Sequence, residues 1–177
     1  VASMTVGSYA QAGGTFFLGS NTLNLGGNFT KTGGIFDEGT GTVVSNTYWG
    51  MTFNVDTTET FYNLTANVTG NYSTNISSGD TLIVTGTLTL TDGGLDGGTI
   101  DARGDIVQGA AMGAGTTRLN FANDSASQTY TINGGTGPYL YLDSAADASD
   151  SVILNSDASL YGLNITSSFS GSTSFTY

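Results

Sequence analysis

Residues 22–29 read Thr-Leu-Asn-Leu-Gly-Gly-Asn-Phe, and residues 99–106 read Thr-Ile-Asp-Ala-Arg-Gly-Asp-Ile. Apolar and polar side chains alternate in the first half of each stretch, which is typical of a strand with one buried face. Gly27 and Gly104 follow at matching positions and indicate a turn. Because the two stretches agree in kind at most positions, we infer an internal repeat made of short strands and turns, with a unit of about 77 residues.

Other parts of the chain match at a similar separation. Gly39–Thr42 matches Gly113–Thr116, and Phe61–Leu64 matches Tyr139–Leu142, with small differences in separation that insertions in turns would produce. The stretch Leu160–Asn164 fits either the region after Phe61 or the strand after Asp80, so its register stays open. We expect a single domain over residues 1–177, with a partial repeat at 1–21 and pseudo-repeats at about 22–98 and 99–177.

The composition favours a β-solenoid over a helical or disordered chain. The 177 residues include 27 Gly and 1 Pro, yet 38% of the chain is hydrophobic, with 9 Phe and 9 Tyr to build a core. Short strands between frequent glycine turns suit coils that bury an apolar face on the next coil. The sequence therefore predicts an all-β fold, a right-handed parallel β-helix, and the phase of its two ends indicates a piece of a longer array.

The charge balance excludes several classes of function. The net charge is −11, and the three cations, Lys31, Arg103 and Arg118, are far apart in the sequence. No basic patch could neutralise a phosphate backbone, so we expect no nucleic-acid partner. No stretch is apolar enough for membrane insertion. The absence of Cys and His removes disulfides, thiolate metal sites and the commonest general base.

A set of short segments carries a resemblance to a known class of repeats. The segments are 26–36 (GGNFTKTGGIF), 39–43 (GTGTV), 61–65 (FYNLT) and 84–94 (VTGTLTLTDGG). Together they resemble the β-solenoid repeats of large bacterial and archaeal surface proteins, which are distantly similar to filamentous-haemagglutinin and autotransporter passenger domains. The resemblance implies an extracellular or cell-surface location and a structural or adhesive role. It transfers no catalytic residue and no cofactor.

Two local motifs have both a functional and a structural interpretation. Arg103-Gly104-Asp105 is the tripeptide that integrins bind, but its repeat counterpart is Gly26-Gly27-Asn28, which favours a simple turn. The acidic residues Asp92, Asp96, Asp101 and Asp105 lie close together in the sequence among glycines. Carboxylates on turns can bind Ca²⁺, so these residues are candidate calcium ligands, with solvated turn aspartates as the alternative.

Seven asparagines begin Asn-x-Ser/Thr sequons and are candidate glycosylation sites. They are Asn28, Asn63, Asn67, Asn71, Asn75, Asn123 and Asn164. Four of them recur at every fourth position and would share a face of one extended strand unless a turn separated them. We expect glycans on the outward-facing members, above all near Asn67 and Asn71, because Gly70 indicates an exposed turn.

Three other functions compete with a structural role. Carbohydrate cleavage needs two carboxylates across a groove, and no pair stands out, so we expect no enzyme activity. Ice binding would use a threonine ladder such as Thr85, Thr87, Thr89 and Thr91. Carbohydrate binding, the main alternative function, would use aromatic side chains that face one groove. The candidates are Tyr48, Trp49, Tyr62, Tyr72, Tyr139 and Tyr141.

The two ends of the chain carry no recognisable cap. Residues 1–19 contain no charged side chain, and residues 167–177 form a Ser, Thr and aromatic run of high β-propensity. Native proteins usually protect exposed strand edges with charge, proline or a covering helix. We therefore expect self-assembly, in which the strand at 170–177 pairs head to tail with the start of another unit, in a homopolymer or within one longer chain; surface glycans are a further possible partner.

Overall fold

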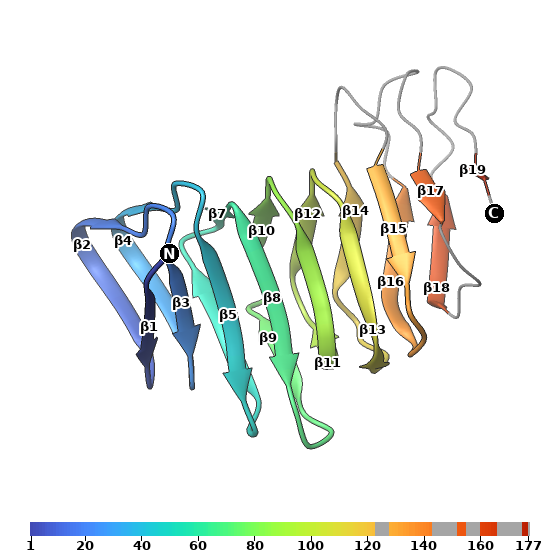
Figure 1. Cartoon of the computed structure of the whole chain (residues 1–177), viewed down its shortest axis with the longest axis horizontal. Helices are drawn as coiled ribbons and strands as arrows, with labels where there is room; N and C mark the ends of the chain where they lie inside the picture. Colours follow the sequence, from blue (N-terminus) through green and yellow to red (C-terminus); the bar gives the residue numbers. More distant parts are fainter. Residues whose placement is uncertain (123–127, 143–151, 155–159, 166–174, 177) are drawn as a thin grey trace.

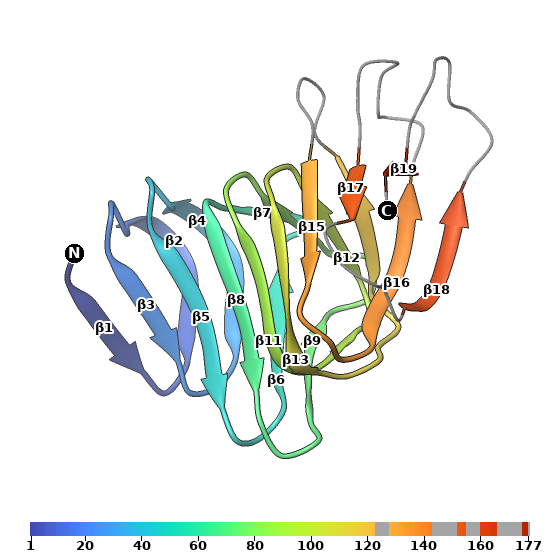
Figure 2. The ribbon, with the colours of Figure 1, turned by 45° about the vertical axis from the view of Figure 1, so that its right-hand side comes forward.

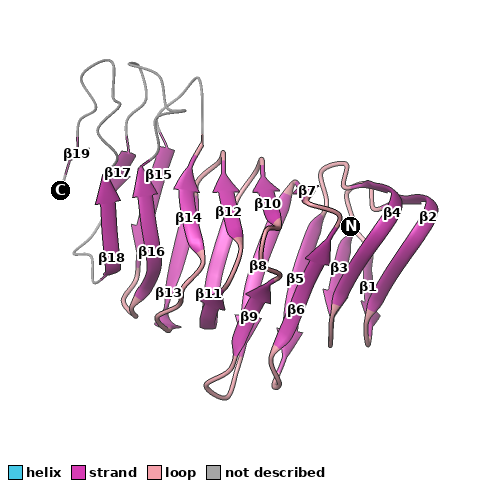
Figure 3. Ribbon diagram, turned by 180° about the vertical axis from the view of Figure 1, so that it is seen from behind, coloured by secondary structure: helices cyan, strands magenta, loops and turns pink. Residues whose placement is uncertain are grey.

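The computed structural model describes residues 1–122, 128–142, 152–154, 160–165 and 175–176. Across these residues the chain contains strands and turns and no helix (Figure 3). The strands stack side by side along one long axis, from the N-terminus at one end to the C-terminus at the other (Figure 1). The parallel β-solenoid predicted from the sequence is confirmed.

The coils form three sheets, and every pairing between described strands is parallel. Sheet A contains, in stacking order, β1 (Ser3–Val6), β3 (Thr22–Leu25), β5 (Thr42–Thr47), β8 (Asn63–Val68), β11 (Leu88–Asp96), β13 (Ile106–Met112), β15 (Gln128–Ile132), β17 (Val152–Leu154) and β19 (Phe175–Thr176). Sheet B contains β2 (Tyr9–Phe17), β4 (Phe29–Asp37), β6 (Met51–Val55), β9 (Ser73–Ile76) and the second half of β11. Sheet C contains β7 (Thr58–Phe61), β10 (Thr81–Val84), β12 (Thr99–Ala102), β14 (Arg118–Phe121), β16 (Gly137–Leu142) and β18 (Leu160–Ile165).

The structural repeat is one coil, and its length varies. Leu64 pairs with Leu88, and Leu88 pairs in turn with Ile106, so the first of these two coils is longer than the second. The sequence matches between the two pseudo-repeats do not keep to one sheet, because Leu23 lies in sheet A and its counterpart Ile100 lies in sheet C. The long repeat therefore relates similar strand-and-turn units on different sheets of the solenoid.

The last strand of sheet C, β18, pairs with β16, and the order of the sheet continues through β14, β12 and β10 to β7. This sheet contains both β10, the strand after Asp80, and β7, which ends at Phe61. The pairing therefore agrees with either of the two fits considered from the sequence, and the repeat register of this strand stays open.

Alternation of apolar and polar residues builds the core. In β3, β10, β12 and β14 every second side chain is buried and the others face outward. Because pairing is in register, the inward residues form columns across the coils, such as Leu82, Ile100 and Leu119 in sheet C. Each column places apolar surface on apolar surface, which supplies most of the stability of a solenoid.

Stacked aromatic rings fill the first coils. The rings of Tyr9 and Phe29 stack with centroids 4.6 Å apart, and Phe53 continues this column at 5.6 Å from Phe29. A second column pairs Phe16 with Phe36 at 5.6 Å. Such offset contacts add about 0.5–1.5 kcal/mol per pair to the burial of apolar area.

The interior of the later coils contains two glutamine side chains. Gln108 and Gln128 are fully buried at inward positions of β13 and β15. The Gln108 amide donates to the Gly134 carbonyl and accepts from the Tyr130 hydroxyl, and the Gln128 amide donates to the Ala102 carbonyl. Burial raises the pKa of Tyr130 well above its ordinary value. These bonds give the buried amide groups of both glutamines hydrogen-bond partners, without which their burial would be costly.

Glycines at the corners allow coils to approach closely. A Cβ added to Gly104 would collide with the carbonyl oxygen of Gly86 in the preceding coil, and one added to Gly27 would lie 2.6 Å from the carbonyl oxygen of Gly7. Gly26, by contrast, has only ordinary neighbours, the nearest at 3.5 Å.

We predict that Gly104→Ala lowers the free energy of unfolding by about 1–3 kcal/mol, because the coils must separate to admit the methyl group. Gly26→Ala, the matched control, should change it by less than about 0.5 kcal/mol. Urea unfolding followed by circular dichroism measures both values, and equal effects for the two variants would contradict the role of close coil contact at Gly104.

Candidate functional site

The N-terminal coil is an open end of the solenoid. Among the described strands, β1 pairs only with β3, and β2 pairs only with β4. The other edge of each strand therefore has no neighbouring strand among the described residues, and Figure 2 shows β1 at the end of the stack. These edges are what a further coil would bind through main-chain hydrogen bonds.

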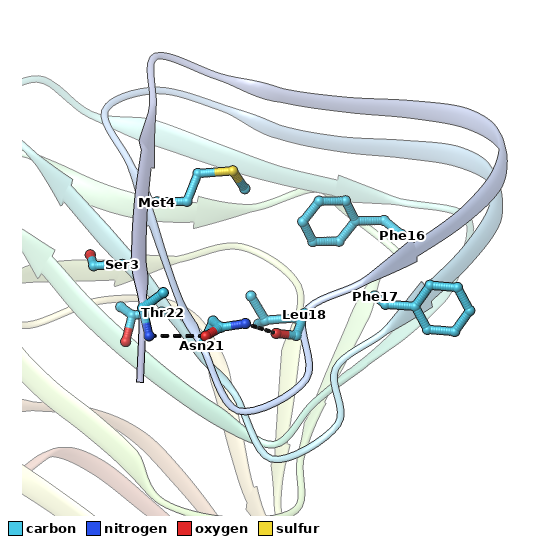
Figure 4. Close-up of a pocket in the computed structure, with 8 residues that line it drawn as sticks. Ser3, Met4, Phe16, Phe17, Leu18, Asn21 and Thr22 are labelled. Atoms are coloured by element: carbon cyan, nitrogen blue, oxygen red, sulfur yellow. Dashed lines mark hydrogen bonds between the residues drawn. The ribbon is translucent and has the colours of Figure 1, made fainter.

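Apolar side chains line the mouth of this open coil. Met4 of β1 and Phe16 of β2 point into the space between the two strands, whereas Phe17 points outward (Figure 4). The space is a pocket of about 250 Å³. Met4 is 41% exposed and Phe17 is 72% exposed. The side chain of Asn21 links two segments that line the pocket. It accepts a hydrogen bond from the Ala2 amide and donates one to the Leu18 carbonyl.

A buried ion pair lies one coil below the open end. The Lys31 ammonium is 2.7 Å from the Glu59 carboxylate, and both side chains are nearly buried. Glu59 occupies an inward position of β7, in register with the buried Leu82. Burial, with a smaller contribution from the Glu59 charge, raises the pKa of the nearby Tyr9 to about 12.

The predicted acidic cluster is not assembled as a metal site. Asp92 and Asp96 lie in β11, Asp101 in β12 and Asp105 in the following turn. Each carboxylate accepts a hydrogen bond: Asp92 from the Gly93 amide, Asp101 from the Asn120 side chain, and Asp105 from the Thr129 amide. Within the described part of the chain, no three acidic side chains come together as a candidate metal site.

Asp96 has a structural role in joining two coils. Its carboxylate accepts hydrogen bonds from the backbone and the hydroxyl of Thr116, each at 3.0 Å. Burial alone would raise the pKa of Asp96, but bonds from Ser73 and Thr116 outweigh this effect and hold the pKa below its ordinary value. The carboxylate is thus stabilised in its charged form by protein donors.

The sequon asparagines mostly bond to neighbouring coils. The side chain of Asn63 accepts from the Thr87 amide, that of Asn67 donates to Asn46, and that of Asn75 donates to the Met51 carbonyl. Asn28 is exposed, although its side chain accepts from the Thr52 amide.

Asn71 is exposed in the turn between β8 and β9, so the turn predicted from Gly70 is confirmed and separates the four regularly spaced sequons. Asn123 lies outside the described residues. Asn164 lies in β18, where only the backbone is described.

The Arg103-Gly104-Asp105 segment forms the corner between β12 and β13. Gly104 is needed there for close contact with the preceding coil, and Asp105 is already bonded to the next one. These contacts favour the turn interpretation over a receptor motif. The threonine ladder is also divided, since Thr85 and Thr87 lie in the turn before β11 while Thr89 lies in the strand between Thr65 and Val107.

The aromatic candidates fall into separate groups. Tyr48, Trp49 and Tyr72 form one exposed cluster, with ring centroids between 5.0 and 6.2 Å apart. Tyr139 and Tyr141 lie 5.2 Å apart on the outer face of sheet C, where the Arg118 guanidinium covers the Tyr141 ring at 4.4 Å. Tyr62 is exposed between β7 and β8 and belongs to neither group. Sequence spacing alone did not show that Tyr72 joins the two residues from the preceding coil.

Comparisons with protein-family models, with curated proteins and with solved structures found no match to this chain. Among the described residues, no helix has the length and apolar character needed to cross a membrane.

We predict that Lys31→Met lowers the free energy of unfolding by about 3 kcal/mol, because it leaves the Glu59 carboxylate buried without a partner. The double variant Lys31→Met/Glu59→Leu should recover most of this loss, since a leucine continues the column formed by Leu82. Urea unfolding of the two single variants and the double variant gives the coupling energy. Additive losses would contradict the pairing.

Proposed function

We propose that this chain is a structural segment of an extracellular fibre, filament or adhesin, and that it extends by stacking a further coil on its N-terminal coil. The observation that carries the proposal is the open end formed by β1 and β2, where unpaired strand edges surround an apolar pocket. A coil of similar shape would satisfy the backbone groups and bury Met4 and Phe16 in the same step.

The aromatic columns support this geometry. Tyr9 and Phe16 are the last members of their columns and are only partly buried, whereas Phe29 and Phe36 one coil below are buried on both sides. The end also lacks charge, since residues 1–19 contain no charged side chain. Charged residues are a common device against edge pairing, and their absence leaves the edge competent to associate.

The outer surface supports an extracellular role. Its strands present Thr and Asn outward, as β3 and β8 do, and the net charge is −11. Such a surface stays soluble while backbone hydrogen bonds along the axis give a stiff rod. The resemblance of the repeats to those of large surface proteins points the same way, and the role proposed here requires no catalytic group.

We predict that the purified chain self-associates end to end and that Met4→Lys weakens this association at least about tenfold, a change of about 1.4 kcal/mol. The lysine would place a charge in the apolar mouth. Analytical ultracentrifugation over a range of concentrations gives the association constant, and negative-stain microscopy gives the shape of the assemblies.

Ile35→Lys is the matched control, because Ile35 is 61% exposed on β4, one coil away from the open end. It adds the same charge and should leave association unchanged. A chain that remains monomeric at high concentration, or equal effects of the two lysines, would overturn the proposal.

A further inference from the structure

Two neighbouring turns bring three exposed aromatic side chains together. Tyr48 and Trp49 lie in the turn between β5 and β6, and Tyr72 lies in the turn between β8 and β9, one coil further along. The centroid distances are 5.0 Å for Tyr48 and Trp49 and 5.4 Å for Trp49 and Tyr72. The exposed fractions are 59%, 63% and 40% for Tyr48, Trp49 and Tyr72. This amount of exposed aromatic surface in one place is unusual unless it binds something.

The cluster is held in place by the backbone of the two turns. The Thr69 amide donates to the Thr47 carbonyl at 3.0 Å, and the Trp49 amide donates to the Thr47 hydroxyl at 3.1 Å. The Tyr48 ring lies against Gly70, where a Cβ would approach the ring carbons to 3.0 Å. Gly70 also has a φ of +76°, a conformation that glycine adopts without strain. The rings are therefore preorganised, which lowers the entropy lost on binding.

A pocket lies directly beside the aromatic cluster. At the corner where the two preceding coils carry aromatic rings, the residues by which the next two coils line the surface are small, apart from Asp92. The small residues are Gly93, Gly94, Ala111, Gly113 and Ala114. The result is a pocket of about 240 Å³ whose wall includes Asn71, Tyr72 and Ser73. Tyr72 belongs to both features, so the aromatic cluster continues directly into the pocket.

The charged side chain that lines the pocket is a carboxylate. The Asp92 carboxylate lines the pocket and uses one oxygen to accept from the Gly93 amide at 2.7 Å. No lysine or arginine lines the pocket, and the protein carries a net charge of −11. A carboxylate with spare acceptor capacity suits a ligand rich in hydroxyl donors, and the negative charge disfavours an acidic ligand.

We propose that this is a binding site for a neutral oligosaccharide. One sugar ring stacks with its apolar face on the ring of Trp49 or Tyr72, and the next places hydroxyl groups toward Asp92 in the pocket. Flat aromatic surface beside a few polar groups is the general form of a small-ligand site. The site lies away from the open N-terminal coil, so this proposal does not depend on end-to-end assembly.

Trp49 is the only tryptophan of the chain and reports on the site directly. The test titrates the full chain, produced in a host without N-glycosylation, with cellohexaose, mannohexaose, chitohexaose and the acidic hexagalacturonic acid. It uses a protein concentration at which ultracentrifugation shows one species. We expect a saturable change in Trp49 emission with at least one neutral hexasaccharide and none with the acidic one.

Two variants test the aromatic ring and the pocket separately, and a third serves as the control. Tyr72→Ala should weaken binding at least about tenfold, as expected for an aromatic anchor. Ala114→Leu, which fills the exposed floor of the pocket, should have a similar effect. Tyr62→Ala removes an equally accessible tyrosine outside the cluster and should change the affinity less than about twofold.

Circular dichroism shows whether each variant keeps the fold, and isothermal titration calorimetry repeats the affinities without relying on fluorescence. The proposal is overturned if no neutral sugar binds at millimolar concentration. It is also overturned if hexagalacturonic acid binds as tightly as the neutral sugars, or if Tyr62→Ala weakens binding as much as Tyr72→Ala does.

Discussion

Parallel hydrogen bonding between one coil and the next is the constraint on which the rest of this structure depends. Each inner strand bonds to a coil on either side, so similar coil shape matters more than identical sequence. This is why the coils can differ in length, as those that begin at Leu64 and Leu88 do, while the inward columns stay in register. The corner glycines belong to the same constraint, because Gly104 and Gly27 bring successive corners into backbone contact.

The same constraint underlies the proposed stacking at the N-terminal coil. The buried Phe29 and Phe36 lie on β4, which has a neighbouring strand on each side, but Met4 and Phe16 lie on strands that pair on one side only among the described residues. The Lys31–Glu59 pair shows that this end tolerates charge in its interior when the charge is matched. A charge placed between Met4 and Phe16 would have no such partner. Covering this end with a further coil would then bury an unpaired charge, which is unfavourable.

The alternation in Thr22–Leu25 and the glycine turns were sufficient to predict a parallel solenoid, because both are local properties of the chain. The sheet to which each strand belongs could not be predicted in this way, because it depends on contacts between coils. Residues matched by the long internal repeat lie on different sheets, since strands on any sheet obey the same alternation. Gln108 and Gln128 were likewise beyond prediction, because their inward side chains bond to carbonyl groups that lie 26 positions away in the sequence.

The candidate sites divide in the same way. The exposed turn at Asn71 followed from Gly70 alone. The aspartates that are neighbours in the sequence are instead separated by the turns of the coil, and they accept hydrogen bonds from donors in the same coil or the next one. Tyr72 joins Tyr48 and Trp49 only because two turns of adjacent coils extend together.

Cryo-electron microscopy of the concentrated protein tests the central claim most directly, by showing the junction between successive copies. Coil-on-coil stacking at the N-terminal end predicts that the strand spacing of about 4.8 Å continues through the junction without a break. Copies that meet side by side, or a junction where this spacing is lost, would contradict it.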